Sequence, residues 1–343
     1  MTKSTTVQPS PRLVGTRSDI FFILLAGPFI SLVLLWGIWH GPTFLIGAAL
    51  FALLLDIPHL LHTYVALLSS PAEFARHQRP FWLGLAAITT LCIGLALADQ
   101  LLLLVTIWVY WQPYHVCKQH FGVATMYARK SGYKANTDHV KTLVLAGFAA
   151  PLLYRLTHGG FEFGHYVLFG NTLPFSGLKV YSPVLPEWIA WIGYAVFAIV
   201  MVRFVLEERR DARSGQALPR FVWIMLALSL ALYNAAYLLI GDLYALILIG
   251  TSVHAIQYHL VCVSTVKTRL ADAEAVPTVS PVLAWCHRRV KALGSHPLYW
   301  AGSLFVASSL VMATEFPTLG IVPLILVLHH FYLDGVIWKR KAK

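Results

Sequence analysis

The chain has 343 residues, of which 58% are hydrophobic and only 12% are charged, and its mean hydropathy is +0.67. Soluble domains carry about 25% charged residues, so this composition excludes an ordinary soluble protein and indicates a membrane protein. The formal charge of +11 does not indicate a nucleic-acid partner, because the basic residues lie in short segments between apolar runs and form no single patch.

Ten apolar runs are long enough to cross a hydrocarbon core about 30 Å thick, which requires about 20 helical residues. They predict one all-α domain, a polytopic transmembrane bundle over 20–338, between a polar tail (1–19) and a basic tail (339–343). Two connecting segments, 155–182 and 267–296, have room for short surface helices. In chain order, the predicted spans are 20–40, 43–69, 81–98, 100–127, 142–157, 183–204, 221–240, 243–266, 297–314 and 318–338.

Lysine and arginine are concentrated in every second connection between the predicted spans. The positive-inside rule therefore predicts that both termini are cytoplasmic. The expected location is the inner membrane of a bacterium, with membrane lipids around the bundle. Because the four cysteines form no CxxC pair, we expect free thiols at Cys92, Cys117, Cys262 and Cys286.

The second predicted span, 43–69, contains the first group of intramembrane ionisable residues. Such residues are costly in lipid, so they usually face the bundle interior and indicate a function. His59 and His62 are three residues apart, and Asp56 lies three residues before His59. On an α-helix this spacing places all three on one face.

The fourth and eighth predicted spans each contain two histidines five residues apart. These pairs are His115 with His120 and His254 with His259. In a straight α-helix, five residues separate two side chains by about 140°, which is awkward for one shared ion. A π-bulge, often found at functional sites, would bring the members of each pair closer together.

The last predicted span ends with His329, His330 and, one turn later, Asp334. All four motifs lie in the cytoplasmic half of their spans, which predicts a single layer of potential metal ligands. Imidazole nitrogens suit iron, copper, zinc and nickel, and added carboxylates favour non-haem iron. We predict one or two iron ions, with surplus histidines orienting the ligands. The candidate metal-binding residues are His59, His62, His115, His120, His254, His259, His329, His330, Asp56 and Asp334.

Five further histidines at the predicted span ends or in connections are expected at the membrane interface. They are His40, His77, His139, His287 and His296.

Several motifs together resemble the Brp/Blh family of membrane carotenoid-cleaving dioxygenases. The similarity comprises Pro58-His59, His120-Phe121-Gly122, the paired histidines of the eighth span, and His329 followed five residues later by Asp334. It implies a polytopic fold, iron held by histidines and oxidative cleavage of a carotenoid such as β-carotene to retinal. More loosely, the histidine motifs are similar to those of membrane desaturases and hydroxylases.

Three functions remain open at this point. The first is a membrane-embedded, iron-dependent oxygenase that acts on a lipophilic substrate from the bilayer with O2, and that has an electron donor as a further partner. The second is a haem-binding electron-transfer or haem-handling protein, since facing helices can each supply one axial histidine. The third is a transporter that moves metal ions or protons through intramembrane His and Asp residues.

Overall fold

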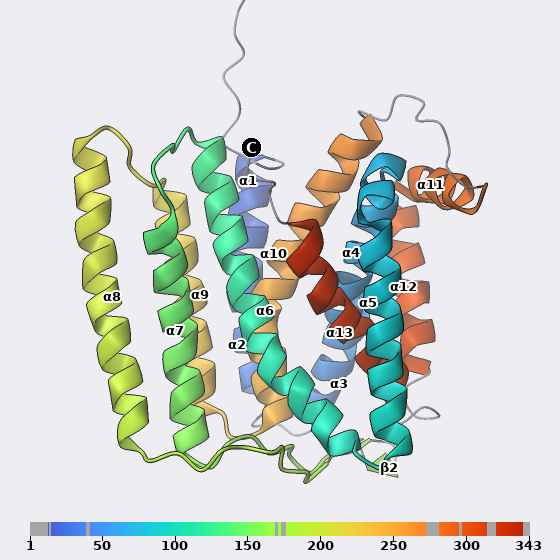
Figure 1. The fold of residues 1–343 in the computed structure, drawn as a ribbon, viewed down its shortest axis with the longest axis horizontal. Coiled ribbons are helices and arrows are strands. Elements are labelled where there is room, and N and C mark those ends of the chain that lie inside the picture. Colours follow the sequence, from blue (N-terminus) through green and yellow to red (C-terminus); the bar gives the residue numbers. More distant parts are fainter. Residues whose placement is uncertain are drawn as a thin grey trace, which may run out of the picture.

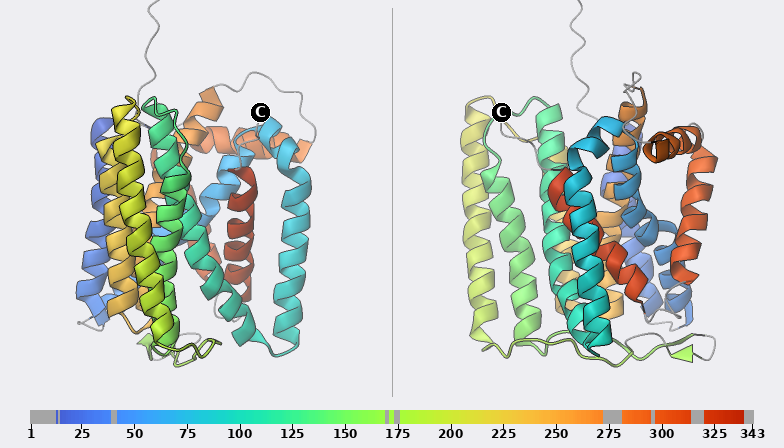
Figure 2. Two further views of the ribbon diagram at one scale, coloured as in Figure 1. Left: turned by 60° about the vertical axis from the view of Figure 1, so that its left-hand side comes forward. Right: turned by 45° about the vertical axis from the view of Figure 1, so that its right-hand side comes forward.

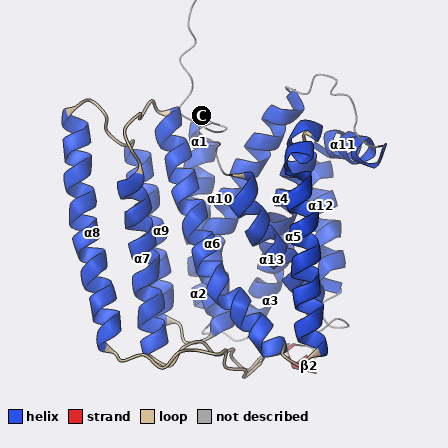
Figure 3. Ribbon diagram, in the orientation of Figure 1, coloured by secondary structure: helices blue, strands red, loops and turns tan. Residues whose placement is uncertain are grey.

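The computed structural model describes residues 13, 15–38, 42–168, 171–172, 176–271, 281–294, 297–313 and 320–338. The predicted tails 1–19 and 339–343 therefore lie largely outside the described residues. Figure 3 shows that helices dominate the described part of the chain. The elements are α1 (Thr16–Asp19), the π-helical η1 (Ile20–Leu25), α2 (Ala26–Ile38), α3 (Pro42–Phe51), the π-helical η2 (Ala52–Asp56), α4 (Ile57–Leu68), α5 (Pro71–Leu97), α6 (Leu101–Lys130), α7 (Asp138–Thr157), β1 (Val167–Leu168), β2 (Asn171–Thr172), α8 (Trp188–Arg213), α9 (Arg220–Leu239), α10 (Leu243–Ala271), α11 (Pro281–Gly294), α12 (Pro297–Ala313) and α13 (Ile321–Ile337).

Each of the ten predicted spans coincides with a helix or with a run of consecutive helical segments. The short helix expected within 267–296 is also present as α11. The residues described within 155–182 form no separate surface helix. Instead, β1 and β2 pair as antiparallel strands of two residues each, and Glu162 makes isolated bridges to Lys179 and Asp242. α5 begins ten residues before the predicted 81, because Ser70 caps it through the Glu73 amide outside the apolar run.

In the part of the chain that the structure describes, seven helical stretches are both long enough and apolar enough to cross a membrane, so the chain is an integral membrane protein. α6 is not among them, since it is long but carries polar residues at its centre. The seven are Thr16–Gly37, Phe44–Leu68, Pro71–Leu97, Asp138–Thr157, Trp188–Arg213, Arg220–Leu239 and Leu243–Arg269.

The long helices run side by side between two ends of the bundle (Figure 1). The α6–α7 and α8–α9 connections lie at one end, where α11 runs across the bundle, and the long α7–α8 connection lies at the other end (Figure 2). α7, α8 and α9 form one side of the molecule, whereas α4, α5, α12 and α13 form the other. α6 and α10 stand between the two groups, and the candidate site lies beside them.

Small residues bring α2 and α10 into close contact. A Cβ added at Gly27 would lie 2.6 Å from the Cα of Val253, so only glycine fits this helix crossing. Ser31 and Ser252 contact each other through their hydroxyls, and Ser31 also bonds the Ile249 carbonyl at 3.2 Å. In lipid, helices associate through such small side chains and interhelical hydrogen bonds. This contact fixes the position of α10 one residue before His254.

Candidate metal centre

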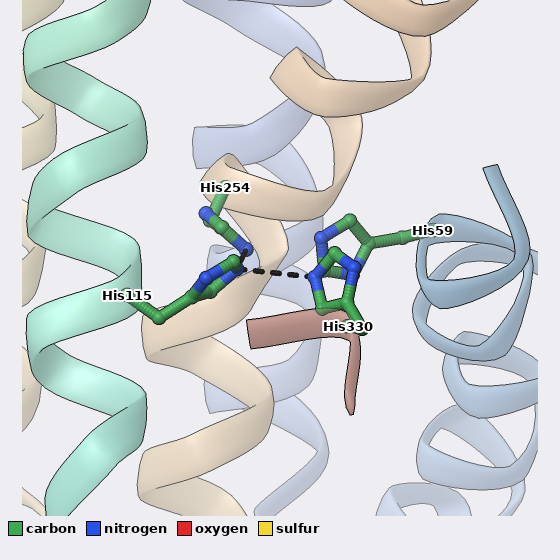
Figure 4. Close-up of side chains that lie close together, drawn as sticks. All are labelled: His59, His115, His254 and His330. Carbon is green, nitrogen blue, oxygen red and sulfur yellow. Dashed lines mark hydrogen bonds between the residues drawn. The ribbon is translucent and has the colours of Figure 1, made fainter. Parts of the chain in front are cut away.

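Four histidines from four different helices converge inside the bundle (Figure 4). His59 comes from α4, His115 from α6, His254 from α10 and His330 from α13. One ring nitrogen of each lies within 4.8 Å of the corresponding nitrogen of the other three. The residues are 5% exposed or less. The four rings therefore form a compact, dry group of nitrogen atoms.

Nitrogen atoms of three of these rings are close enough to share protons or a metal ion. His115 Nε2 lies 3.2 Å from His254 Nε2 and 3.1 Å from His330 Nε2 (Figure 4). His330 Nδ1 is 2.7 Å from the Thr63 hydroxyl, which itself donates to the carboxylate of Asp334. When Thr63 donates to Asp334, its hydroxyl accepts the Nδ1 proton, and the lone pair of His330 Nε2 then points towards His115.

Two ordinary two-centre hydrogen bonds cannot form at His115 Nε2 when the rings are neutral, because this nitrogen carries either one proton or one lone pair. With the His330 Nε2 lone pair facing inwards, His115 Nε2 must carry the proton of that contact. A protonated His115 Nε2 has no lone pair left to accept from His254. A cation between the rings removes this conflict, because every nitrogen can then present a lone pair.

His59 supplies a second indication that the cluster suits a metal ion. Its ring nitrogens make no hydrogen bond of good geometry, with the Asp56 backbone as a marginal partner, although the residue is only 2% exposed. A buried polar group left in this state costs about 1–3 kcal/mol. Its ring centroid lies 4.6 Å from those of both His254 and His330. Two nitrogen ligands of one tetrahedral ion are separated by about 3.4 Å, close to the nitrogen contacts at His115.

Asp334 lies next to the cluster and contacts the residue that holds His330. Its Oδ1 accepts hydrogen bonds from Thr63 at 3.0 Å, from Tyr258 at 2.7 Å and from Trp338 at 3.2 Å. Its Oδ2 lies 3.9 Å from the Nε2 atoms of both His115 and His330. The Asp334 carboxyl group thus fixes the His330 ring through Thr63 and lies beside the nitrogen cluster.

A small cavity adjoins the cluster. It has a volume of about 30 Å³ and is lined by polar groups of Asp56, His59, Gln112 and Thr251 among apolar side chains. A cavity of about 10–15 Å³ already holds one water molecule, so this space admits one or two small molecules next to the ring nitrogens. Asp56, a predicted ligand, is therefore beside the cavity and outside the four-histidine group.

His62 and His259, also predicted as ligands, form a separate pair. Their Nδ1 atoms are 2.7 Å apart, the Trp300 indole donates to His62 Nε2 at 3.1 Å, and His259 Nε2 lies 2.9 Å from the Leu55 carbonyl. These contacts assign one donor-to-acceptor direction to the series of hydrogen bonds: Trp300 donates to His62, His62 donates to His259, and His259 donates to the Leu55 carbonyl. All four ring nitrogens are thereby occupied.

The two remaining predicted histidines also lie outside the group of four. His120 is buried near Phe148, with its ring centroid 6.4 Å from that of His254. His329 lies between α4 and α5, where its Nδ1 contacts the Tyr64 hydroxyl of α4 at 3.0 Å and its Nε2 lies 3.2 Å from the Phe81 carbonyl of α5.

The fourth and eighth spans contain no π-bulge that would bring the paired histidines together, since α6 and α10 are α-helical throughout. Only the first histidine of each pair reaches the cluster, as the 140° separation on an α-helix dictates. A π-helical segment, η2, does occur directly before α4. Two features accompany the π-helical pattern there. Pro58 has no backbone N–H to donate, and the Leu55 carbonyl of η2 accepts a hydrogen bond from His259.

Sequence reasoning missed Thr63 and Tyr258, which hold Asp334 and His330 in place. Both lie four residues after a cluster histidine, Thr63 after His59 and Tyr258 after His254. Side chains four residues apart share a helix face, so this spacing was a usable signal. The three cysteines whose side chains the structure describes, Cys92, Cys117 and Cys262, are free and buried, as expected, whereas the Cys286 side chain is outside the described part.

A second group with metal-ligand chemistry lies where α7 begins and α8 ends. His139, expected at the interface, is buried with Glu208 and lies near Asp211. His139 Nε2 lies 2.7 Å from a Glu208 oxygen, and the Tyr133 hydroxyl donates to Asp211 at 2.6 Å. Burial raises the pKa of Tyr133, and the two carboxylates raise it further. Because these groups satisfy one another, we interpret them as a hydrogen-bonded contact between helices.

Comparisons of the chain with models of protein families, with curated proteins and with solved structures return no match. The similarity of its motifs to the Brp/Blh dioxygenases therefore stays a prediction. Functional assignment depends on the residues of the cluster and their surroundings.

Proposed function

We propose that this chain is an iron-dependent oxygenase embedded in the membrane and acting on a lipophilic substrate. The observation that supports it most directly is the buried group of His59, His115, His254 and His330, whose nitrogens cannot all be satisfied by one another. The proposal includes ten membrane spans with both termini cytoplasmic, in a bacterial inner membrane.

Iron is among the metals that the four residues suit, and the space beside them fits dioxygen. Neutral imidazole binds iron, copper, zinc and nickel, and four nitrogens suffice for one ion. Bound iron would supply the capacity to activate dioxygen. The cavity of about 30 Å³ next to His59 and His115 has the size for a diatomic molecule. Oxidative cleavage of a carotenoid is the specific reaction that the sequence motifs suggest.

The chain's own residues would bind, orient and exclude water in this reaction. The four histidines hold the ion, while Asp334 and Thr63 keep the His330 lone pair directed at it. Apolar side chains around the cavity, such as Trp108 and Phe331, exclude bulk water. Exclusion of water prevents side reactions and strengthens electrostatic interactions inside the site.

Haem is a less suitable group for this cluster. Ring centroids of His59, His254 and His330 lie as close as 4.6 Å, and the adjoining cavity is far smaller than a porphyrin. A transporter differs in a measurable way, because its ion would exchange during turnover whereas a catalytic ion stays bound.

Metal analysis together with an absorption spectrum of the purified full chain tests the proposal. We expect about one iron per chain in the wild type and loss of most of it in His59→Ala. His120→Ala is the matched control, since it removes a buried histidine outside the cluster, and it should retain iron. A wild type without metal overturns the proposal, and a Soret band would identify haem instead.

A test of the reaction uses cells that accumulate β-carotene. Loss of colour with appearance of retinal in wild-type cells, but not in cells with His59→Ala, supports carotenoid cleavage. Unchanged β-carotene with iron present in the protein contradicts that substrate and leaves the oxygenase to be assayed on other lipophilic compounds.

A further inference from the structure

An apolar groove of about 370 Å³ lies between η2, α10 and α12. Leu54 and Leu55 line one wall, Ile256 and Leu260 the second, and Ala301 the third. This volume falls in the range of about 300–1,000 Å³ found for small-molecule sites. The groove is therefore large enough for part of a hydrocarbon ligand.

The groove opens where the protein faces lipid. Three residues that line it, Phe22, Leu54 and Phe305, are 41%, 51% and 45% exposed. They belong to helices that are long or apolar enough to lie in the membrane. A molecule dissolved in the hydrocarbon core would reach the groove without crossing water.

The only polar side chains that line the groove offer no free hydrogen-bonding group. These are His62, His259 and Trp300. Trp300 donates to His62, His62 to His259, and His259 to the Leu55 carbonyl. A charged or strongly polar ligand group would lose its hydration here without gaining a partner. The wall thus selects for an uncharged hydrocarbon chain.

Two histidine contacts between α4 and α10 connect the groove with the metal centre. His59 and His254 meet on the side of the small cavity, with ring centroids 4.6 Å apart. His62 and His259 meet on the side of the groove, 4.7 Å apart. His62 follows His59 by less than one helical turn, so the groove floor and the cluster are neighbours on α4.

We propose that this groove binds an uncharged hydrocarbon chain taken laterally from the bilayer, and that the paired His62 and His259 form its floor next to the metal centre. The identity of this ligand as the substrate rests on the proposed function. Binding in the groove does not.

Photo-crosslinking in phosphatidylcholine nanodiscs tests the inference on the full chain. The probe is a hexadecane with a mid-chain diazirine, compared with hexadecanoic acid that carries the diazirine at the same position. In the wild type, crosslinks of the hydrocarbon should concentrate on peptides of η2, α10 and α12. The acid should label these peptides about tenfold less.

Ala301→Trp fills the groove and should lower this labelling about tenfold, which corresponds to ~1.4 kcal/mol of binding. Val306→Trp is the matched control, because Val306 is 58% exposed on the same helix and does not line the groove. Leu304→Trp, also within the groove, provides a second blocking variant if Ala301→Trp does not fold.

Equal labelling of Ala301→Trp and Val306→Trp, or stronger labelling by the acid, would overturn the inference. Metal content measured on the same samples separates the two proposals. Groove labelling in a protein without iron supports the proposed ligand groove and contradicts the proposed oxygenase function. Bound iron without groove labelling contradicts the proposed ligand groove and leaves the proposed oxygenase function standing.

Discussion

Two consecutive histidines of α13 have opposite surroundings. His330 points into the cluster, whereas His329 contacts Tyr64 and the Phe81 carbonyl on the side of α5. Neighbouring residues of an α-helix project about 100° apart, so one helix turn supplies both a candidate ligand and a contact with the next helix. The sequence HH does not indicate which of the two binds metal.

At the residue scale, Thr63→Val tests how His330 is held. The variant keeps the side-chain shape but removes the acceptor of the His330 Nδ1 proton and a donor to Asp334. Loss of such a supporting partner typically lowers metal affinity about 10–100-fold. Competition with a chelator measures the affinity, and we expect a decrease in that range.

The control for this variant is Thr265→Val. Thr265 donates to the Val261 carbonyl of its own helix, and it lies about 16 Å along α10 from His254. Its replacement should leave metal affinity unchanged. Equal affinities of both variants and the wild type would contradict the role of Thr63.

The residues predicted a site with histidine ligands, but they did not predict which histidines belong to it. Spacing showed that only one histidine of His115/His120 and of His254/His259 can face a common point on a straight helix. Which one does so depends on the rotation of α6 and α10 about their axes, which packing sets. His62 met every spacing criterion, yet Trp300 and His259 occupy both of its nitrogens.

At the scale of elements, the α2–α10 crossing determines where His254 lies. Gly27→Ala would place a methyl group 2.6 Å from the Val253 backbone and force the helices apart. Overpacking of this kind costs about 1–3 kcal/mol. We therefore expect a lower thermal unfolding midpoint and, because Val253 precedes His254, weaker metal binding.

Gly94→Ala on α5 is the matched substitution, since an added Cβ there meets no atom within 4 Å. Alanine is favoured over glycine in a helix by about 0.5–1 kcal/mol, so this variant should be as stable as the wild type or more so. If Gly27→Ala also retains full stability and metal affinity, the crossing does not control the site.

Apolar run length was sufficient to locate all ten predicted helices, because crossing a hydrocarbon core imposes one length and one backbone conformation. The same argument does not apply outside the core. Polar caps such as Ser70 extended α5, and backbone pairing in 155–182 replaced the expected helix with a hairpin. Local contacts, which hydropathy does not describe, decide these segments.

At the scale of the whole molecule, the two ends of the bundle differ in their exposed connections. Val184 is 99% exposed in the α7–α8 connection, and Ser214 is exposed in the α8–α9 turn at the opposite end. The positive-inside rule predicts that the α8–α9 end is cytoplasmic. In intact cells, a membrane-impermeant maleimide should label Val184→Cys but not Ser214→Cys.

Both variants carry Cys286→Ser, because the other three cysteines are buried and do not compete for the reagent. Ser214→Cys should become reactive after the membrane is permeabilised. Labelling of Ser214→Cys but not Val184→Cys in intact cells would reverse the orientation.

The four cluster histidines are spread over the chain from residue 59 to residue 330, one on each of four helices. No partial chain that lacks α13 contains the complete set, so a metal ion held by all four histidines would bind only after synthesis and membrane insertion of the last helix. During biogenesis, bound metal would therefore mark a molecule whose helices have all assembled. A chain halted before α13 would carry the same early motifs without the ability to keep the ion.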